Sequence, residues 1–244
     1  MGKIMLVTSG KGGTGKSTVA LNLALSLVRE GKKAIVIELD SGMRCIDLML
    51  GIDSIVYDLG DILSGNCQLQ EAIYEAEGID NLGIIAAPAD PKYSASSQRF
   101  VSLCRQLSTV YDFVILDTPA GIGSPLPAAA EAASHALVVT NLTPVSVRDA
   151  EKATEFLRRA GHKRIRLVVN FVPLEFDSID EIADIDDIID TVGAQLIGII
   201  PEDKLFKKCV SLRTKKEIKK SVGNVAFENL AARVLGRDVP LLFE

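Results

Sequence analysis

Gly-Lys-Gly-Gly-Thr-Gly-Lys-Ser-Thr, residues 10–18, is the stretch that decides how the rest of the chain is interpreted. Before it, residues 3–8 form a short apolar run with the length of a buried strand. After it, residues 17–29 are apolar on almost every side, which is typical of a buried helix, and Gly31 then provides a stop. The stretch is therefore a glycine-rich loop between a strand and a helix, with the spacing G-x-x-x-x-G-K-[ST].

Such a loop has the chemistry of a phosphate cradle. Its glycines allow backbone N–H groups to converge on phosphate oxygens, and the helix start adds positive potential. Lys16 is expected to reach the β- and γ-phosphates, and the Ser17 hydroxyl is expected to bind Mg²⁺. The residues predicted to hold a nucleotide here are Gly12, Gly13, Thr14, Gly15, Lys16, Ser17 and Thr18.

The strand–helix alternation continues along the whole chain. Further strands are predicted at residues 34–38, 82–86, 113–117, 136–140, 165–170 and 195–200, and helices at 95–108, 145–160, 179–191 and 224–235. No linker or change of composition divides the sequence. We therefore predict one α/β domain over residues 1–244, a doubly wound and mostly parallel sheet with helices on both faces. This is the three-layer, Rossmann-like architecture of P-loop NTPases.

Composition excludes several other classes of protein. Apolar residues make up 48% of the chain and charged residues 24%, which is ordinary for a globular protein. No apolar run approaches the roughly 18 residues that span a bilayer, and the start lacks a signal peptide. The four cysteines have no C-x-x-C spacing and there are only two histidines, so a zinc, redox or His-rich metal site is not expected. The chain is predicted to be cytoplasmic.

Two acids follow predicted strands near the loop. Asp117 ends an apolar strand and suits Mg²⁺ coordination, the alternative being a turn or helix cap. Asp40 follows strand 34–38, where a carboxylate could orient the attacking water or contact Mg²⁺. The predicted metal-site residues are therefore Ser17, Asp40 and Asp117.

The run KGGTGKST, residues 11–18, resembles the variant phosphate loop of the MinD/ParA family, the bacterial septum-site and partitioning ATPases. In that family the first lysine reaches the nucleotide of a partner subunit in a sandwich dimer. The resemblance therefore gives Lys11 a role in trans, whereas the residue alone would equally suit a solvated loop. Segments 41–48, 117–122, 146–149 and 199–203 extend the match at similar spacing, and the septum-site branch is the more similar.

The resemblance implies further roles for individual residues. Asp40 belongs to a first switch that supports hydrolysis, so Lys11, Lys16 and Asp40 are the expected catalytic residues. Asn170, Pro201 and Asp203 are expected to line the base pocket, although Asn170 could simply cap the end of a strand. Arg148 and Asp149 are expected to lie near the surface that contacts the second subunit or a partner. Glu38 stands where the family commonly has Asp, and its role is left open.

The implied function is slow, Mg²⁺-dependent ATP hydrolysis that works as a timer for positioning cell division. ATP would favour a homodimer, ADP would release it, and a protein activator or cargo would act on the switch. Alternatives are a ParA-like partition ATPase that binds DNA nonspecifically, a cofactor-handling P-loop enzyme, and a scaffold that binds ATP without hydrolysing it. The scattered cysteines argue against relatives that hold an iron–sulfur cluster.

The expected contact surface is a basic island. Residues 204–220 carry eight Lys or Arg and one Glu, within a chain whose net charge is −5. Septum-site relatives usually end in a basic amphipathic helix, and the last residues here, with Pro240, are not expected to form one. The island is therefore the candidate for contact with the inner face of the cell membrane, with DNA phosphates as the less favoured partner and a plain solvated face as the alternative.

Overall fold

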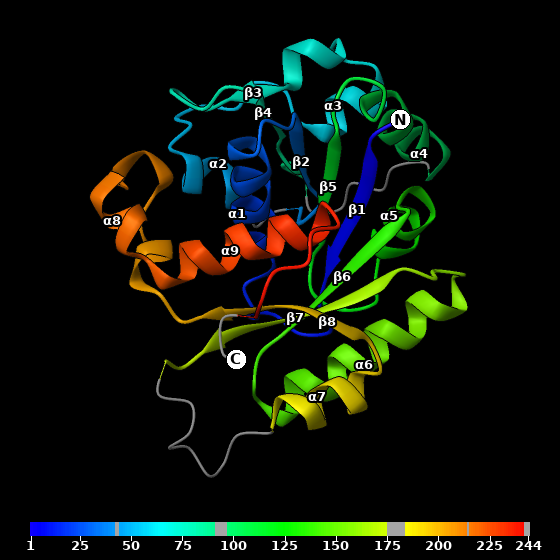
Figure 1. Cartoon of the computed structure of the whole chain (residues 1–244). Helices are drawn as coiled ribbons and strands as arrows, with labels where there is room; N and C mark the ends of the chain where they lie inside the picture. Colours follow the sequence, from blue (N-terminus) through cyan, green and yellow to red (C-terminus); the bar gives the residue numbers. More distant parts are fainter. Residues whose placement is uncertain (42–43, 91–96, 175–183, 214, 242–244) are drawn as a thin grey trace.

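The computed structural model describes residues 1–41, 44–90, 97–174, 184–213 and 215–241 of the chain. Within them, eight strands form one sheet in the order β3-β4-β2-β5-β1-β6-β7-β8 (Figure 1). All neighbouring pairs are parallel except β3 with β4. The strands are β1 (Lys3–Thr8), β2 (Ala34–Glu38), β3 (Tyr74–Glu75), β4 (Leu82–Ile85), β5 (Phe113–Asp117), β6 (His135–Thr140), β7 (Ile165–Val172) and β8 (Gln195–Pro201).

Helices cover both faces of this sheet. The α-helices are α1 (Lys16–Arg29), α2 (Ile46–Leu50), α3 (Leu59–Ser64), α4 (Ser97–Leu107), α5 (Leu126–Ala132), α6 (Pro144–Arg159), α7 (Ile185–Val192), α8 (Lys215–Lys220) and α9 (Val222–Val234). Short 3₁₀ segments are η1 (Leu69–Ala72), η3 (Lys204–Lys207) and η4 (Val210–Leu212). Helices α1, α2 and α9 contribute to one apolar core, and α3 to α7 contribute to the other.

Alternation along the strands divides the core between the two faces. In β1, Ile4 and Leu6 pack into the core beneath α4, α5 and α6, whereas Met5 and Val7 pack against α1 and α9. Strands buried on both faces appear in sequence as continuous apolar runs, which is why their positions could be predicted. The prediction of a doubly wound, mostly parallel sheet with helices on both faces is confirmed.

Several short elements were not predicted from the sequence. The strand β3, the helices α2, α3, α5 and α8, and the 3₁₀ segments are each seven residues or fewer, too short for a clear period. At two predicted helices part of the range, residues 95–96 and 179–183, lies outside the described residues. The described part of the second begins at Ile185, with the Asp184 side chain accepting from the backbone N–H of Asp186. Helix α9 begins at Val222, two residues earlier than predicted, because the Ser221 hydroxyl accepts from the N–H of Asn224.

No helix in the part of the chain that the structure describes is long and apolar enough to cross a membrane.

Helix α9 is expected to be a main source of stability. Phe227 is 1% exposed and its ring meets that of Phe206 edge-on, with the centroids 5.0 Å apart. Truncating a buried Phe leaves a cavity, so Phe227→Ala should lower the free energy of unfolding by about 3–5 kcal/mol. Urea unfolding measures this. Val225→Ala, on the same helix at 42% exposure, is the control and should change it little; equal losses in both variants would contradict this account of the core.

Candidate functional site

The phosphate loop joins the carboxyl end of β1 to the start of α1. Gly13 and Gly15 have φ of 78° and 84°, backbone conformations that favour glycine. Gly15 is the N-cap of α1 and makes no side-chain cap, and the first turn of this helix carries no acidic residue. The positive end of the helix is therefore left for an external anion.

Neighbouring elements press against this loop from two sides. A Cβ at Gly10 would overlap the backbone of Asp149 on α6, so only glycine fits there. A Cβ at Gly15 would overlap the Asn170 amide and would lie 2.9 Å from Cζ of Phe171. Asn170, which is 2% exposed, donates from Nδ2 to the carbonyl oxygen of Thr14 at 2.8 Å. The ends of β7 and α6 thus hold the loop in place.

The two loop lysines lie in different environments. Lys16 is buried, and burial lowers the pKa of its ammonium, while the nearby carboxylates of Asp117 and Asp40 oppose that change. Lys11 is exposed to solvent. The geometry therefore places Lys16 inside the site of its own chain and leaves Lys11 free to reach outward.

Asp117 is the central acid of the site. It is 1% exposed, and neither carboxylate oxygen has a hydrogen-bond partner within 3.5 Å among the described residues. The pKa of Asp117 is raised to about 7, mainly by burial. The nearby acids Glu38 and Asp40 also raise it, whereas Ser17 and Lys16 oppose the increase. An unpaired buried carboxylate is costly, so these oxygens are ready to accept a cation or its bound water.

Glu38 has a role that the sequence left open. Its Oε1 accepts from the backbone N–H of Cys45 at 2.7 Å and from that of Ile46 at 3.3 Å, at the start of α2. Its Oε2 is buried and has no hydrogen-bond partner among the residues that the structure describes, and burial raises the pKa of this carboxyl. Ligating atoms of Glu38, Cys45 and Asp117 lie within 4.8 Å of one another. Glu38 therefore ties the segment after β2 to the acid cluster.

The donor set suits Mg²⁺. Asp40 is half-buried beside the loop; burial raises the pKa of its carboxyl, and Lys16 lowers it. Ser17 offers a hydroxyl near Asp117, whose own oxygens are unpaired. Hydroxyl and carboxylate oxygens are the ligands that this hard cation prefers. Contact of Ser17, Asp40 and Asp117 with one cation stays a prediction.

The residues predicted for the base pocket lie at the carboxyl ends of β7 and β8. Pro201 ends β8 and is buried. Asp203 accepts hydrogen bonds from the N–H of Leu205 and the hydroxyl of Ser221; burial would raise its pKa, but these bonds lower it overall. A pocket of about 520 Å³ adjoins Asp203, with Leu174 and Val222 in its lining. Contact of Asn170, Pro201 and Asp203 with a base stays a prediction.

The segment after β5, residues 118–121, lies beside the phosphate loop. Thr118 donates from its backbone N–H and its hydroxyl to the carbonyl oxygen of Val7, which fixes the start of the segment on β1. Gly121 donates to the carbonyl oxygen of Ser9, beside the phosphate loop. On α6, Arg148 is exposed and the Asp149 carboxylate pairs with Lys152 at 3.2 Å. A partner role for Arg148 and Asp149 stays a prediction.

Comparison with known proteins identifies the family. The model of the CobQ/CobB/MinD/ParA nucleotide binding domain matches residues 5–213. The chain belongs to this family. The resemblance seen in the phosphate loop is thereby confirmed.

Relatives in this family include septum-site proteins. The septum site-determining protein MinD of Synechocystis is 36% identical over 99% of this chain and 92% of its own length, and that of Bacillus subtilis is 32% identical over 99% and 92%. Among solved structures, a MinC:MinD cell division protein complex from Aquifex aeolicus gives a TM-score of 0.87 at 29% identity, covering 98% of both chains. MinD complexed with Mg-ADP from Pyrococcus horikoshii gives 0.83 at 29%, covering 96% of both.

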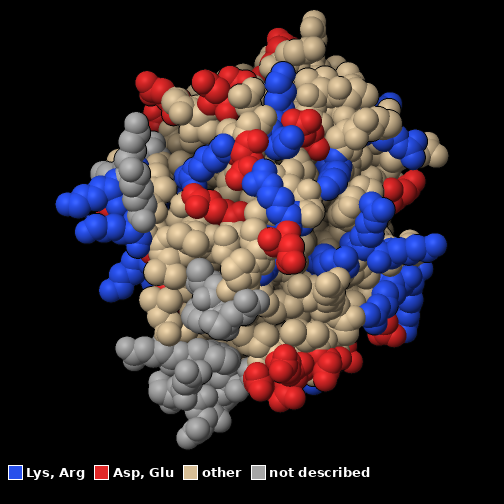
Figure 2. Space-filling view, in the orientation of Figure 1, with Lys and Arg blue, Asp and Glu red and all other residues tan. Residues whose placement is uncertain are grey.

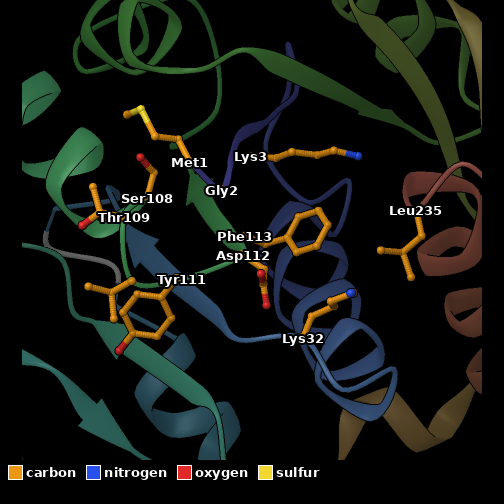
Figure 3. Close-up of a pocket in the computed structure, with 11 residues that line it drawn as sticks. Met1, Gly2, Lys3, Lys32, Ser108, Thr109, Tyr111, Asp112, Phe113 and Leu235 are labelled. Atoms are coloured by element: carbon orange, nitrogen blue, oxygen red, sulfur yellow. The ribbon is translucent and has the colours of Figure 1, made fainter.

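A second cavity lies at the opposite edge of the sheet. Its volume is about 420 Å³, and it is lined by the first residues of β1 and β5 and by the turn before β5 (Figure 3). In Figure 3 the side chains of Lys3 and Phe113 lie together on one side of the cavity, and Tyr111 lies on the other side. The Lys3 ammonium donates to the carbonyl oxygen of Val234 at 3.0 Å. None of the predicted site residues lines this cavity.

Asp117 makes stability depend on pH. Its pKa of about 7 exceeds the unfolded value of 3.8, so the folded chain binds an extra proton between them and the free energy of unfolding falls as pH rises through that range. In EDTA without nucleotide, Asp117→Asn should therefore melt several degrees above wild type at pH 8, and the gain should shrink towards pH 5. Thermal unfolding measures this. Asp190 is exposed, so Asp190→Asn should show no such trend. If the melting temperature of the wild type did not fall relative to that of Asp117→Asn as the pH rises, Asp117 would not have the raised pKa.

Proposed function

We propose that the chain is an ATP-binding and slowly hydrolysing molecular switch for the spatial positioning of cell division. One observation carries the proposal. A buried Asp117, whose pKa the neighbouring Ser17 hydroxyl and Lys16 ammonium lower against the effect of burial, stands at a phosphate loop in a chain that aligns along 99% of its length with a septum site-determining protein. The cofactors are ATP or ADP and Mg²⁺.

The residues of this chain divide the work of phosphoryl transfer. The N–H groups of the loop and the Lys16 ammonium hold the phosphates and stabilise the charge that develops on the transferred group. Bound Mg²⁺, held through Ser17 and the carboxylates of Asp40 and Asp117, would supply further charge neutralisation. Asp40 orients the attacking water. Among the described residues of the site, no cysteine or serine is paired with a histidine that could activate the nucleophile, so we expect a slow reaction that a partner accelerates.

The partners follow from the same site. We infer that two ATP-bound copies pair through their phosphate loops, with the exposed Lys11 of each reaching the nucleotide of the other, and that ADP releases them. The MinC:MinD cell division protein complex from Aquifex aeolicus, whose fold this chain shares, supports a further protein partner for a chain of this family. For this chain we propose an activator or cargo of that kind, contacting the outward face near Arg148.

The surface to which the dimer attaches is a separate proposal. Figure 2 shows Lys and Arg side chains gathered at the left edge, where Figure 1 places α8. The exposed lysines of η3 and α8 include Lys204, Lys207, Lys216 and Lys220. We propose that this lysine surface makes a weak, salt-sensitive contact with the inner face of the cell membrane. A partition-type contact with DNA phosphates is the alternative.

Co-sedimentation separates these two surfaces. The full chain is mixed with anionic liposomes or with plasmid DNA, each with ATP, ADP or no nucleotide, at two salt concentrations. We expect ATP-dependent pelleting with liposomes that high salt abolishes, because exposed lysines act through screened electrostatics. Lys216→Glu together with Lys220→Glu should weaken it. ATP-dependent retention on DNA alone would contradict the membrane proposal and favour the partition function.

The trans role of Lys11 has a direct test. Lys11→Ala should keep ATP binding near wild type, because Lys16 and the loop N–H groups remain, but should lose ATP-dependent dimerisation. Light scattering coupled to size exclusion gives the mass, and titration with a fluorescent ATP analogue gives the affinity. Lys33→Ala, an exposed lysine before β2, is the control. A Lys11→Ala protein that still dimerises with ATP would remove the trans role.

A further inference from the structure

The residue after Asn170 has an unusual backbone. Phe171 has φ of 59°, in the left-handed region that side chains other than glycine rarely occupy. In the described part of the chain it shares this property with one other non-glycine residue, Asn81. Asn tolerates the conformation well, whereas Phe has no side-chain group that compensates for it. A strained residue of this kind persists where the surrounding structure imposes it, often at a functional site.

The strand pairing explains how the strain arises. Strands β7 and β8 pair Asn170 with Ile200 and then Val172 with Pro201, so the register shifts at Phe171. One extra residue on β7 is the mark of a β-bulge, which redirects a side chain and is common beside active sites. The N–H of Glu202 donates to the carbonyl oxygen of Val172 just beyond it, which fixes the far side of the irregularity.

The redirected ring meets the phosphate loop. Cζ and Cε2 of Phe171 lie 2.9 and 3.2 Å from the place where a Cβ of Gly15 would be. Gly15 itself has φ of 84° and begins α1. The ring is 40% exposed, although every other residue from Leu167 to Val172 is buried. The partly exposed Phe171 ring therefore packs against Gly15, the glycine at which the loop joins the helix.

We infer that Phe171 is a positioning residue for the phosphate loop: its ring holds Gly15 in the conformation that presents the loop N–H groups to a nucleotide. This inference rests on the proposed nucleotide binding and adds a residue that the sequence pattern does not contain. Asn170 supports the loop from the same strand by its hydrogen bond to Thr14. Loss of the ring leaves Gly15 free to sample other conformations, so a bound nucleotide is released faster.

The experiment measures release and stability in the same variants. Mg²⁺ and a fluorescent methylanthraniloyl-ADP are bound to the full chain, and excess unlabelled ADP chases it in a stopped-flow instrument. Phe171→Ala should release the analogue about tenfold faster than wild type, and Phe171→Tyr, which keeps the ring, should restore the wild-type rate. Thermal unfolding without nucleotide is recorded for every variant. The melting temperature of each must lie above the temperature of the chase, which shows that the variant is folded while release is measured.

Phe171→Gly separates positioning from stability. Glycine relieves the positive φ while removing the ring, so this variant should match or exceed the wild-type melting temperature and still release the nucleotide about as fast as Phe171→Ala. Asn81→Gly is the matched control, because it relieves the other positive φ far from the loop and should leave release unchanged.

Two failures are distinguishable. Wild-type release rates in both Phe171→Ala and Phe171→Gly would overturn the inference, as would a rate change that Phe171→Tyr fails to restore. A wild-type chain that binds no nucleotide at all with Mg²⁺ would instead overturn the proposed function.

Discussion

The site depends on a buried electrostatic balance at the carboxyl end of the central strand β5. Asp117 and Glu38 are each 1% exposed, and three of their four oxygens have no hydrogen-bond partner among the described residues. Lys16, itself buried, is the positive group that lowers the pKa of Asp117. Burial raises the pKa of both acids because too few donors stabilise their charge. We propose that a cation from outside completes the arrangement, which would link folding energetics to the binding of Mg²⁺ and a nucleotide.

The sheet brings these groups together and the packing fixes the loop. The middle of the sheet contains the parallel strands β2, β5, β1, β6 and β7, in that order. Their carboxyl ends lie at one edge of the sheet. The phosphate loop, Glu38, Asp117 and Asn170 lie at or near the carboxyl ends of four of these strands and are therefore brought to that edge. The loop is then confined by backbone at Gly10 and by side chains at Gly15. Anion binding by a helix start needs the N–H groups held in position, and this close packing supplies that rigidity.

The sequence was sufficient for the long, buried elements and for the loop, because continuous apolar strands and the G-x-x-x-x-G-K-[ST] spacing are strong local signals. It was not sufficient for α2, α3 or α5, which are too short to show a period. It also missed two residues at the site. The roles of Glu38 and Phe171 depend on contacts with Cys45 and Gly15, which are set by strand pairing and not by any local pattern. A buried acid where the family commonly has Asp was the only signal for Glu38, and nothing in the sequence marked Phe171.

We propose that ATP hydrolysis by this site controls assembly of the chain. The most direct measurement is a single turnover of Mg-ATP in which phosphate release and light scattering are followed together on the wild-type protein. We expect the scattering first to rise to the mass of a dimer and then to return to that of a monomer at the rate at which phosphate appears. Binding of ATP without phosphate release, or phosphate release without any change of mass, would contradict it.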